Sequence, residues 1–405
     1  MTLFSLKTKN LSVFLIGALM ILVPIQYCSE PSFGISALRL SQQQIYQVAS
    51  IGLFAIFILQ NVFLAAFLLW ALFLYAYFDF ASPAGGVVLT ILAGCLIYEA
   101  VYRIVNDQNV KIIFGFMISF ALLNMAYMAF QSFGWELLYK EYGVAGYQAQ
   151  LLGFMGLKAI MGMFFAMAIP FFAYRYPVLS LGLFMPIYVS ECSSAMVAAI
   201  AAYLFQIFFW SKKMFFFLLV LMCIGGGLYA VNDSHAGMFT DRANMWKTVL
   251  RDAVKKPIIG WGPDSFRCVT PDKQFMYWKN VRTKETAQID VRDTIEFTHT
   301  GKYDTKKYGT FIKDGDTTDP WDNPHNEYIQ LFYEFGLPGV LILFLLAWDM
   351  TKRFNWLNWD IVPIAGFFIA LLIMSTGQFP FHLARVGIYI PIFLACYYKL
   401  SDTYV

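Results

Sequence analysis

The residues best suited to chemistry lie in one polar segment, where a histidine stands at the expected start of a helix. Asn323 can cap this helix and Pro324 suits its first position, which predicts that His325 lies in the first turn. Exposed N–H groups and the positive end of the helix dipole gather there, so the position favours anions and disfavours a protonated imidazole. A neutral histidine beside a bound phosphate can act as a general base. Taken alone, an isolated loop histidine is more often a polar surface residue.

A second ordered stretch precedes the first by about 70 residues. The periodicity of residues 241–254 predicts an amphipathic helix that Asp241 can cap and that Pro257 ends. A Gly- and Pro-rich turn follows it, and Gly336 and Pro338 are expected to break the later helix. Arg242 is the basic residue at the start of the earlier helix. In most amphipathic helices such an arginine simply faces solvent.

Composition places these segments in a membrane protein. The chain is 59% hydrophobic and only 14% charged, against roughly 25% charged in soluble proteins. Residues 232–331 hold 15 basic and 15 acidic side chains, which is 30 of the 55 in the chain (29 basic plus 26 acidic). The net charge of +3 gives no reason to expect a nucleic-acid partner.

The apolar runs predict about twelve transmembrane helices, each about 17–25 residues long. The expected spans are residues 11–27, 45–60, 62–79, 85–102, 110–130, 151–173, 176–190, 193–210, 214–231, 332–348, 360–376 and 384–400. The chain therefore divides into an N-terminal membrane domain (1–231, about nine spans), one large loop (232–331) and a C-terminal membrane segment (332–405, about three spans). No small-residue cleavage site follows the first span, so we expect a retained anchor rather than a signal peptide.

Lysine and arginine bias in the short loops sets the orientation. With the N-terminus in the cytoplasm, the opposite face receives only Arg39, Lys140 and Arg385. The cytoplasmic face receives ten basic residues: Lys7, Lys9, Arg103, Lys111, Arg175, Lys212, Lys213, Lys352, Arg353 and Lys399. The large loop follows the ninth span and is therefore expected in the periplasm, with the chain in a bacterial inner membrane.

A set of short motifs resembles the O-antigen ligase and polymerase superfamily. They are Arg242-x-x-x-Trp246, the run Pro257 to Gly262 with Phe266 after it, and Pro324-His325-Asn326-Glu327-Tyr328 leading into Glu334-x-Gly336-Leu337-x-Gly339. Their order and their position after about nine spans agree with that family. The resemblance by motif covers about residues 240–346; before that, only span count and topology agree.

The resemblance implies an all-α, glycosyltransferase class C-like core and a glycosyltransferase that uses a polyprenyl-diphosphate-linked glycan as donor. The acceptor is a lipid A core sugar in ligases, another lipid-linked repeat in polymerases and a protein in related members; the sequence does not choose among them. It also implies that His325 activates the acceptor hydroxyl, with Asn326 beside it at the substrate, and that Arg242 binds the diphosphate. We expect one inverting displacement, no cofactor and no metal. The alternative is a transporter or flippase of a lipid-linked saccharide, which would depend on charges at mid-membrane rather than on the loop.

One departure concerns the second cation. Family members often carry a Ser-Arg pair where this chain has Ser190-Glu191-Cys192. Lys158, expected about seven residues inside the sixth span, is one replacement, although it could instead snorkel or pair with Glu191. Arg385, at the mouth of the last span, is the other, although it could be an interfacial anchor. His382, three residues before it, is a rival base or substrate ligand, although it could belong to a structural corner.

Other features are expected to be structural. Glu99 lies four residues before Arg103 and can pair with it. The acidic run Asp314–Asp319 lacks the glycine and terminal glutamate of a calcium-binding loop. The six cysteines show no paired spacing and are expected to fill apolar space.

Overall fold

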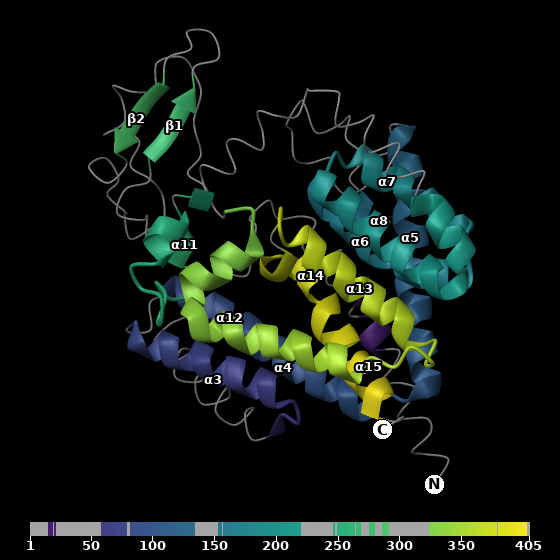
Figure 1. The fold of residues 1–405 in the computed structure, drawn as a ribbon, viewed down its shortest axis with the longest axis horizontal. Coiled ribbons are helices and arrows are strands. Elements are labelled where there is room, and N and C mark those ends of the chain that lie inside the picture. Colours follow the sequence, from purple (N-terminus) through teal and green to yellow (C-terminus); the bar gives the residue numbers. More distant parts are fainter. Residues whose placement is uncertain are drawn as a thin grey trace.

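The computed structural model describes residues 15–18, 20–21, 58–78, 82–133, 153–155, 157–219, 246–247, 249–263, 265–268, 275–279, 286–290, 324–378 and 380–402. The principal elements are α3 (Val62–Tyr77), α4 (Ser82–Ile104), α5 (Asp107–Ser132), η5 (Gly153–Met155), α6 (Lys158–Arg175), η6 (Leu179–Leu183), α7 (Phe184–Val189), α8 (Ser193–Trp210), α11 (Ser265–Cys268), β1 (Phe275–Lys279), β2 (Thr286–Asp290), α12 (Glu327–Arg353), α13 (Ile361–Met374), η8 (Pro380–His382), α14 (Ala384–Gly387) and α15 (Tyr389–Asp402). Figure 1 shows a bundle of helices, with the antiparallel hairpin β1–β2 standing apart from it.

Four described helices are long and apolar enough to cross a membrane: 87–104 within α4, α5, α8 and α12. These positions match four of the expected spans, which confirms a helical membrane protein in this part of the chain. At the expected span 176–190, η6 and α7 follow each other directly and form a shorter apolar helical stretch, Leu179–Val189. Spans expected at 11–27, 45–60 and 214–231 lie largely outside the described residues, so the total of twelve stays a prediction.

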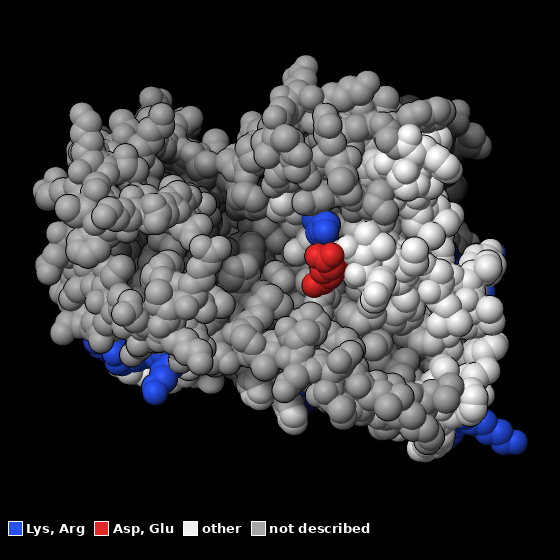
Figure 2. All heavy atoms as spheres, turned by 90° about the horizontal axis from the view of Figure 1, so that it is seen from above, with Lys and Arg blue, Asp and Glu red and all other residues white. Residues whose placement is uncertain are grey.

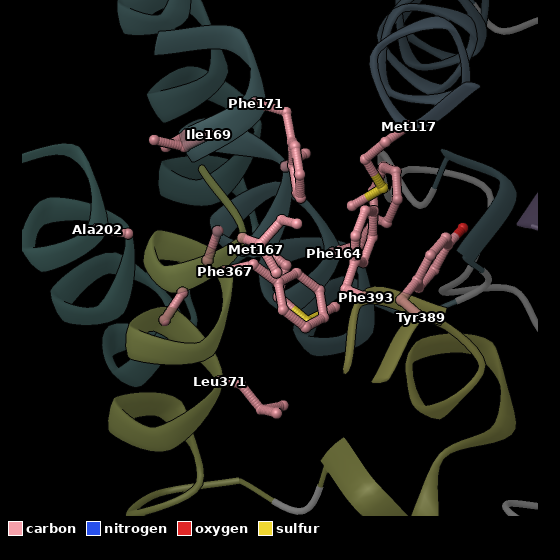
Figure 3. Packing of buried hydrophobic residues seen from close by; sticks show 14 of the residues in the cluster. Met117, Phe164, Met167, Ile169, Phe171, Ala202, Phe367, Leu371, Tyr389 and Phe393 are labelled. Atoms are coloured by element: carbon pink, nitrogen blue, oxygen red, sulfur yellow. The ribbon is translucent and has the colours of Figure 1, made fainter. Parts of the chain in front are cut away.

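The centre of the bundle is α6, whose residues from Ile160 to Ala173 are all buried. It packs against α8 and α13, which also pack against each other. The face of α8 in this core repeats alanine at positions 195, 198, 199 and 202, and such small side chains let membrane helices approach closely. Aromatic rings fill the space that remains. Figure 3 shows Phe171, Phe367 and Phe393 meeting there, with ring centroids of the first and last 4.5 Å apart.

Acidic residues join helices at one end of the bundle. There, Asp360 accepts a hydrogen bond from α6 and pairs with α5, while Asp402 joins α4 to α12. This end, which we call the basic end, holds Arg103, Lys111, Arg175, Lys352, Arg353 and Lys399. The ion pair expected between Glu99 and Arg103 forms there, with 2.6 Å between its atoms. The other end, the loop end, holds residues 246–263 and the start of α12.

Candidate functional site

A backbone-to-backbone joint connects the loop to the membrane core. As expected, α12 is broken at Gly336, whose φ of 65° and ψ of −171° are not helical. The break frees carbonyl groups that would be costly to leave unpaired in a membrane. The helix at 246–247 and 249–253, which we call the loop helix, is followed by a turn that supplies the donors. Trp261 N donates to Tyr333 O at 2.8 Å, and Gly262 N donates to Glu334 O at 3.1 Å. In return, Leu337 N donates to Pro257 O at 2.7 Å.

Two glycines make this joint possible. A Cβ atom on Gly260 would lie 2.6 Å from Glu334 O, and one on Gly336 would lie 2.6 Å from the carbonyl carbon of Ile258. Both contacts are closer than real Cβ atoms allow, so only glycine lets the two backbones meet. From α3, Trp70 Nε1 donates to Phe335 O at 2.8 Å. The glycine-rich turn (257–262) and the helix break (333–337) are separate motifs in the sequence. They form one structural unit, which we call the elbow.

His325 lies before the start of α12, but not where the sequence predicts. The structure begins α12 at Glu327 and uses Asn326 as the N-cap, whose Oδ1 accepts from Ile329 N at 3.1 Å. His325 is thus one residue before the cap, with a left-handed φ of 49°. Asn323, the expected cap, lies outside the described residues. The half-buried histidine still lies at the N-terminal end of the helix, where anions are favoured.

Contacts from three directions fix the backbone around His325. Trp246 Nε1, from the loop helix, donates to Pro324 O at 2.8 Å. After the histidine, Asn326 Nδ2 donates to Thr376 O at 3.1 Å. Glu327 is fully buried, with its amide on Ser375 O at 2.9 Å and its carboxylate on Phe381 N at 2.7 Å. These tertiary partners, which local sequence does not reveal, explain why the cap falls at Asn326.

Residues 324–326, which we call the histidine loop, therefore lie against the connector between α13 and α14, residues 375–383. Its other side touches the start of α8, where Gln378 Nε2 lies 3.5 Å from Cys192 Sγ. Thr376 and Gln378 are two residues apart, so the segment 190–192 and the histidine loop flank the same short turn. This is the region where the sequence lacks the family's arginine.

Lys158 occupies that region. It is the first residue of α6, so the helix does not begin seven residues before it as the sequence predicts, and its depth in the membrane stays a prediction. Its Nζ lies 3.5 Å from Glu191 Oε2, which agrees with the predicted pairing, and the glutamate side chain is 77% exposed. Figure 2 views the molecule from above, and on this face one group of basic atoms lies directly beside a group of acidic atoms. An exposed pair of this kind contributes only about 0–1 kcal/mol, so an anion can displace the glutamate.

Arg385 is buried in α14, which does not fit an interfacial anchor. Its Nη1 donates to the carbonyl oxygen of Met155 in η5. Two polar side chains of α5 hold η5 in turn: Asn124 Oδ1 accepts from Phe154 N and Gln131 Oε1 accepts from Gly153 N, both at 2.9 Å. A row of hydrogen bonds therefore runs from α5 through η5 to α14.

Some predicted residues are not placed. Arg242 and the acidic run 314–319 lie outside the described residues. Residues 246–247 and 249–253 are helical, which confirms the end of the expected loop helix but not its capped start. His382 lies in η8, and the structure describes only its backbone.

The sequence alone does not reveal the supporting residues. Trp246 and Glu327 are parts of the sequence motifs, and in the structure one holds Pro324 and the other holds the connector. Asparagine is a common helix cap, so Asn326 directly before Glu327 is a signal of this helix start that the sequence offers. The sequence predicts a turn at Gly260 and a helix break at Gly336. It does not show that the backbones at these two glycines meet, because the residues are far apart along the chain.

Comparison with known protein families found a match. The model of one protein family, described as O-antigen ligase, matches residues 177–344, which include the α7–α8 region, the elbow and the histidine loop. No curated protein matches the chain.

Proposed function

Because this match supports membership of the O-antigen ligase and polymerase superfamily, we propose that the chain is a membrane glycosyltransferase of polysaccharide assembly. It moves a glycan from a polyprenyl-diphosphate carrier to an acceptor hydroxyl at the loop end. The basic residues at the opposite end support a periplasmic position for the loop end under the positive-inside rule.

The observation that carries the proposal is backbone strain at two facing positions. Among the described residues other than glycine, only His325 (φ 49°) and Glu191 (φ 55°) have a positive φ. Strained positions of this kind persist where the surrounding structure fixes them, and they cluster at functional sites. Here the two residues flank one turn and carry a candidate base and the partner of a candidate phosphate ligand.

The proposed reaction is one displacement. The imidazole of His325 takes the proton from the acceptor hydroxyl as its oxygen forms a bond to the anomeric carbon. The bond from that carbon to the diphosphate oxygen breaks, and the diphosphate leaves with its electron pair. Attack opposite the leaving group inverts the anomeric centre. Lys158, released from Glu191, and Arg242 stabilise the departing charge without a metal.

The remaining predicted residues take supporting roles in this proposal. The Asn326 side chain accepts from Ile329 N through its oxygen and donates to Thr376 O through its nitrogen. In this proposal, Asn326 therefore holds His325 in place rather than binding sugar. Buried Arg385 orders η5 and the start of α6, which carries Lys158. His382 is the reserve candidate for the base.

The test is transfer in vitro by the purified chain, comparing the native protein with His325→Gln. The donor is a polyprenyl-diphosphate glycan, and the acceptors are lipid A core, a second lipid-linked repeat and a carrier protein. Loss of the base is expected to lower kcat by about 10²- to 10⁴-fold without loss of donor binding. His299→Gln, at another histidine of the loop, is the matched control and is expected to keep activity.

The outcomes separate the candidates. The acceptor used assigns the subclass, and NMR of the product linkage is expected to show inversion. Equal transfer by His325→Gln and the native chain would move the base to His382. Movement of the lipid across proteoliposomes, with no transfer to any acceptor, would establish the transporter instead.

A further inference from the structure

A cavity among the described residues lies at the basic end, away from His325. Its volume is about 380 Å³, and it is lined by Lys111, Tyr174, Asn355, Leu357, Asn358, Trp359 and Asp360. A volume of this size is at the lower end of the range for small-molecule sites, about 300–1,000 Å³. Neither the matched family description nor the proposed transfer reaction assigns it a role, and its inference does not depend on that reaction.

The polar groups of the cavity carry both charges. Lys111 Nζ lies 3.5 Å from Asp360 Oδ2, and the lysine side chain is 61% exposed. Tyr174 donates to Asp360 Oδ1 at 2.7 Å, which orients the carboxylate. With one cation and one anion, the cavity is nearly neutral overall, so a purely anionic ligand would meet the carboxylate as well as the lysine.

One amide group that lines the cavity, that of Asn358, lacks a hydrogen-bond partner for its nitrogen among the described residues. Asn358 is 7% exposed, and its Oδ1 accepts from Asp360 N at 3.1 Å. Its Nδ2 is buried and has no hydrogen-bond partner among the described residues. A buried donor without a partner costs about 1–3 kcal/mol, and a ligand oxygen in the cavity would remove this cost.

The surroundings of the cavity fit the membrane interface. Trp356, Leu357 and Trp359 are 64%, 67% and 46% exposed in one short connection between two apolar helices. Tryptophan is enriched at the level of lipid headgroups, where its ring is partly apolar and partly wet. The connection follows Lys352 and Arg353, which belong to the positively charged end of α12.

We propose that this cavity binds the headgroup of a zwitterionic phospholipid with a primary ammonium, in the leaflet at the basic end. The phosphate accepts hydrogen bonds from Lys111 and from Asn358 Nδ2, and the ammonium donates to Asp360. Each charge of the headgroup therefore meets the residue of opposite charge. The acyl chains then lie against the exposed tryptophans. A choline headgroup has no N–H to donate, and a glycerol headgroup has no cation for Asp360.

The test is native mass spectrometry of the full chain in detergent with equal amounts of phosphatidylethanolamine, phosphatidylglycerol and phosphatidylcholine. We expect phosphatidylethanolamine to bind about tenfold more tightly than the other two, the effect of one charge-assisted hydrogen bond. Lys111→Met and Asn358→Leu are each expected to weaken it about tenfold. Lys111 is exposed, so its variant keeps the fold, and the midpoint of thermal unfolding checks both variants.

Lys212→Met is the matched control, because Lys212 is basic but lies over the Phe208 ring outside the cavity lining. It is expected to keep the preference. Equal retention of the three lipids would overturn the proposal, and so would an equal loss in the Lys212 variant. Soluble phosphoethanolamine that competes as strongly as the lipid would also overturn it, because the site would then serve a soluble compound.

Discussion

A single methyl group added at Gly336 is expected to open the elbow and to stop transfer. The φ of 65° and ψ of −171° at this residue lie in a region that is essentially restricted to glycine and costs about 1–3 kcal/mol for other residues. The new Cβ would also overlap the carbonyl of Ile258, so the turn at 257–262 must move away. Three backbone hydrogen bonds join the two segments, and their loss costs about 0.5–1.5 kcal/mol each. Together, these contributions predict a loss of about 3–7 kcal/mol.

The assay compares Gly336→Ala with Gly94→Ala in the same detergent. A Cβ at Gly94 meets nothing within 4 Å, so alanine within α4 is expected to be neutral or to add up to about 1 kcal/mol. Free energy of unfolding and the transfer rate are measured for both. We expect Gly336→Ala to lose both stability and transfer, since the elbow holds the turn at 257–262 against the half of α12 that begins beside His325. If its unfolding free energy stays within about 1 kcal/mol of the native value, a typical effect of any substitution, the account of the elbow is refuted.

Three further predictions concern the support of the site. Glu191→Gln removes the carboxylate that competes for Lys158, so the KM for the donor is expected to fall about two- to fivefold; an unchanged KM would exclude this lysine from the phosphate site. Trp246→Phe deletes the hydrogen bond to Pro324 O and is expected to lower kcat with little change in KM, whereas Trp348→Phe at an exposed position has no effect in the same steady-state assay. Asn124→Leu leaves Phe154 N without its acceptor, at a cost of about 1–3 kcal/mol, and a thermal midpoint equal to that of Leu122→Ala on the exposed face of α5 would contradict this.

Prediction from sequence succeeded where a feature depends on neighbours along the chain. Apolar length located α4, α5, α8 and α12, and the four-residue spacing of Glu99 and Arg103 predicted their pair. The break at Gly336 also followed from local chemistry. All of these are decided within one helix.

The failures concern features that distant segments decide. Asn323 and Pro324 form a good local helix start, but Ser375, Thr376 and Phe381 supply hydrogen-bond partners that favour a start three residues later. Lys158 begins a helix rather than lying inside one, because the apolar run before it is divided by η5. The sequence did not indicate hairpin β1–β2, which falls in a stretch with little hydrophobic pattern.

The elbow sets the rules for exchanging parts between related chains. A hydropathy plot suggests cutting at residues 231 and 331, where the polar loop begins and ends, but residue 331 falls inside α12. A graft with that boundary joins one protein's glycine turn to another protein's helix break, two surfaces that fit only as a matched pair. Boundaries placed after Pro263 and before Pro324 instead leave the turn, the break and the histidine loop from one parent. Recombination between relatives is therefore expected to preserve 246–263 and 324–339 together, while the stretch between them varies in sequence and length.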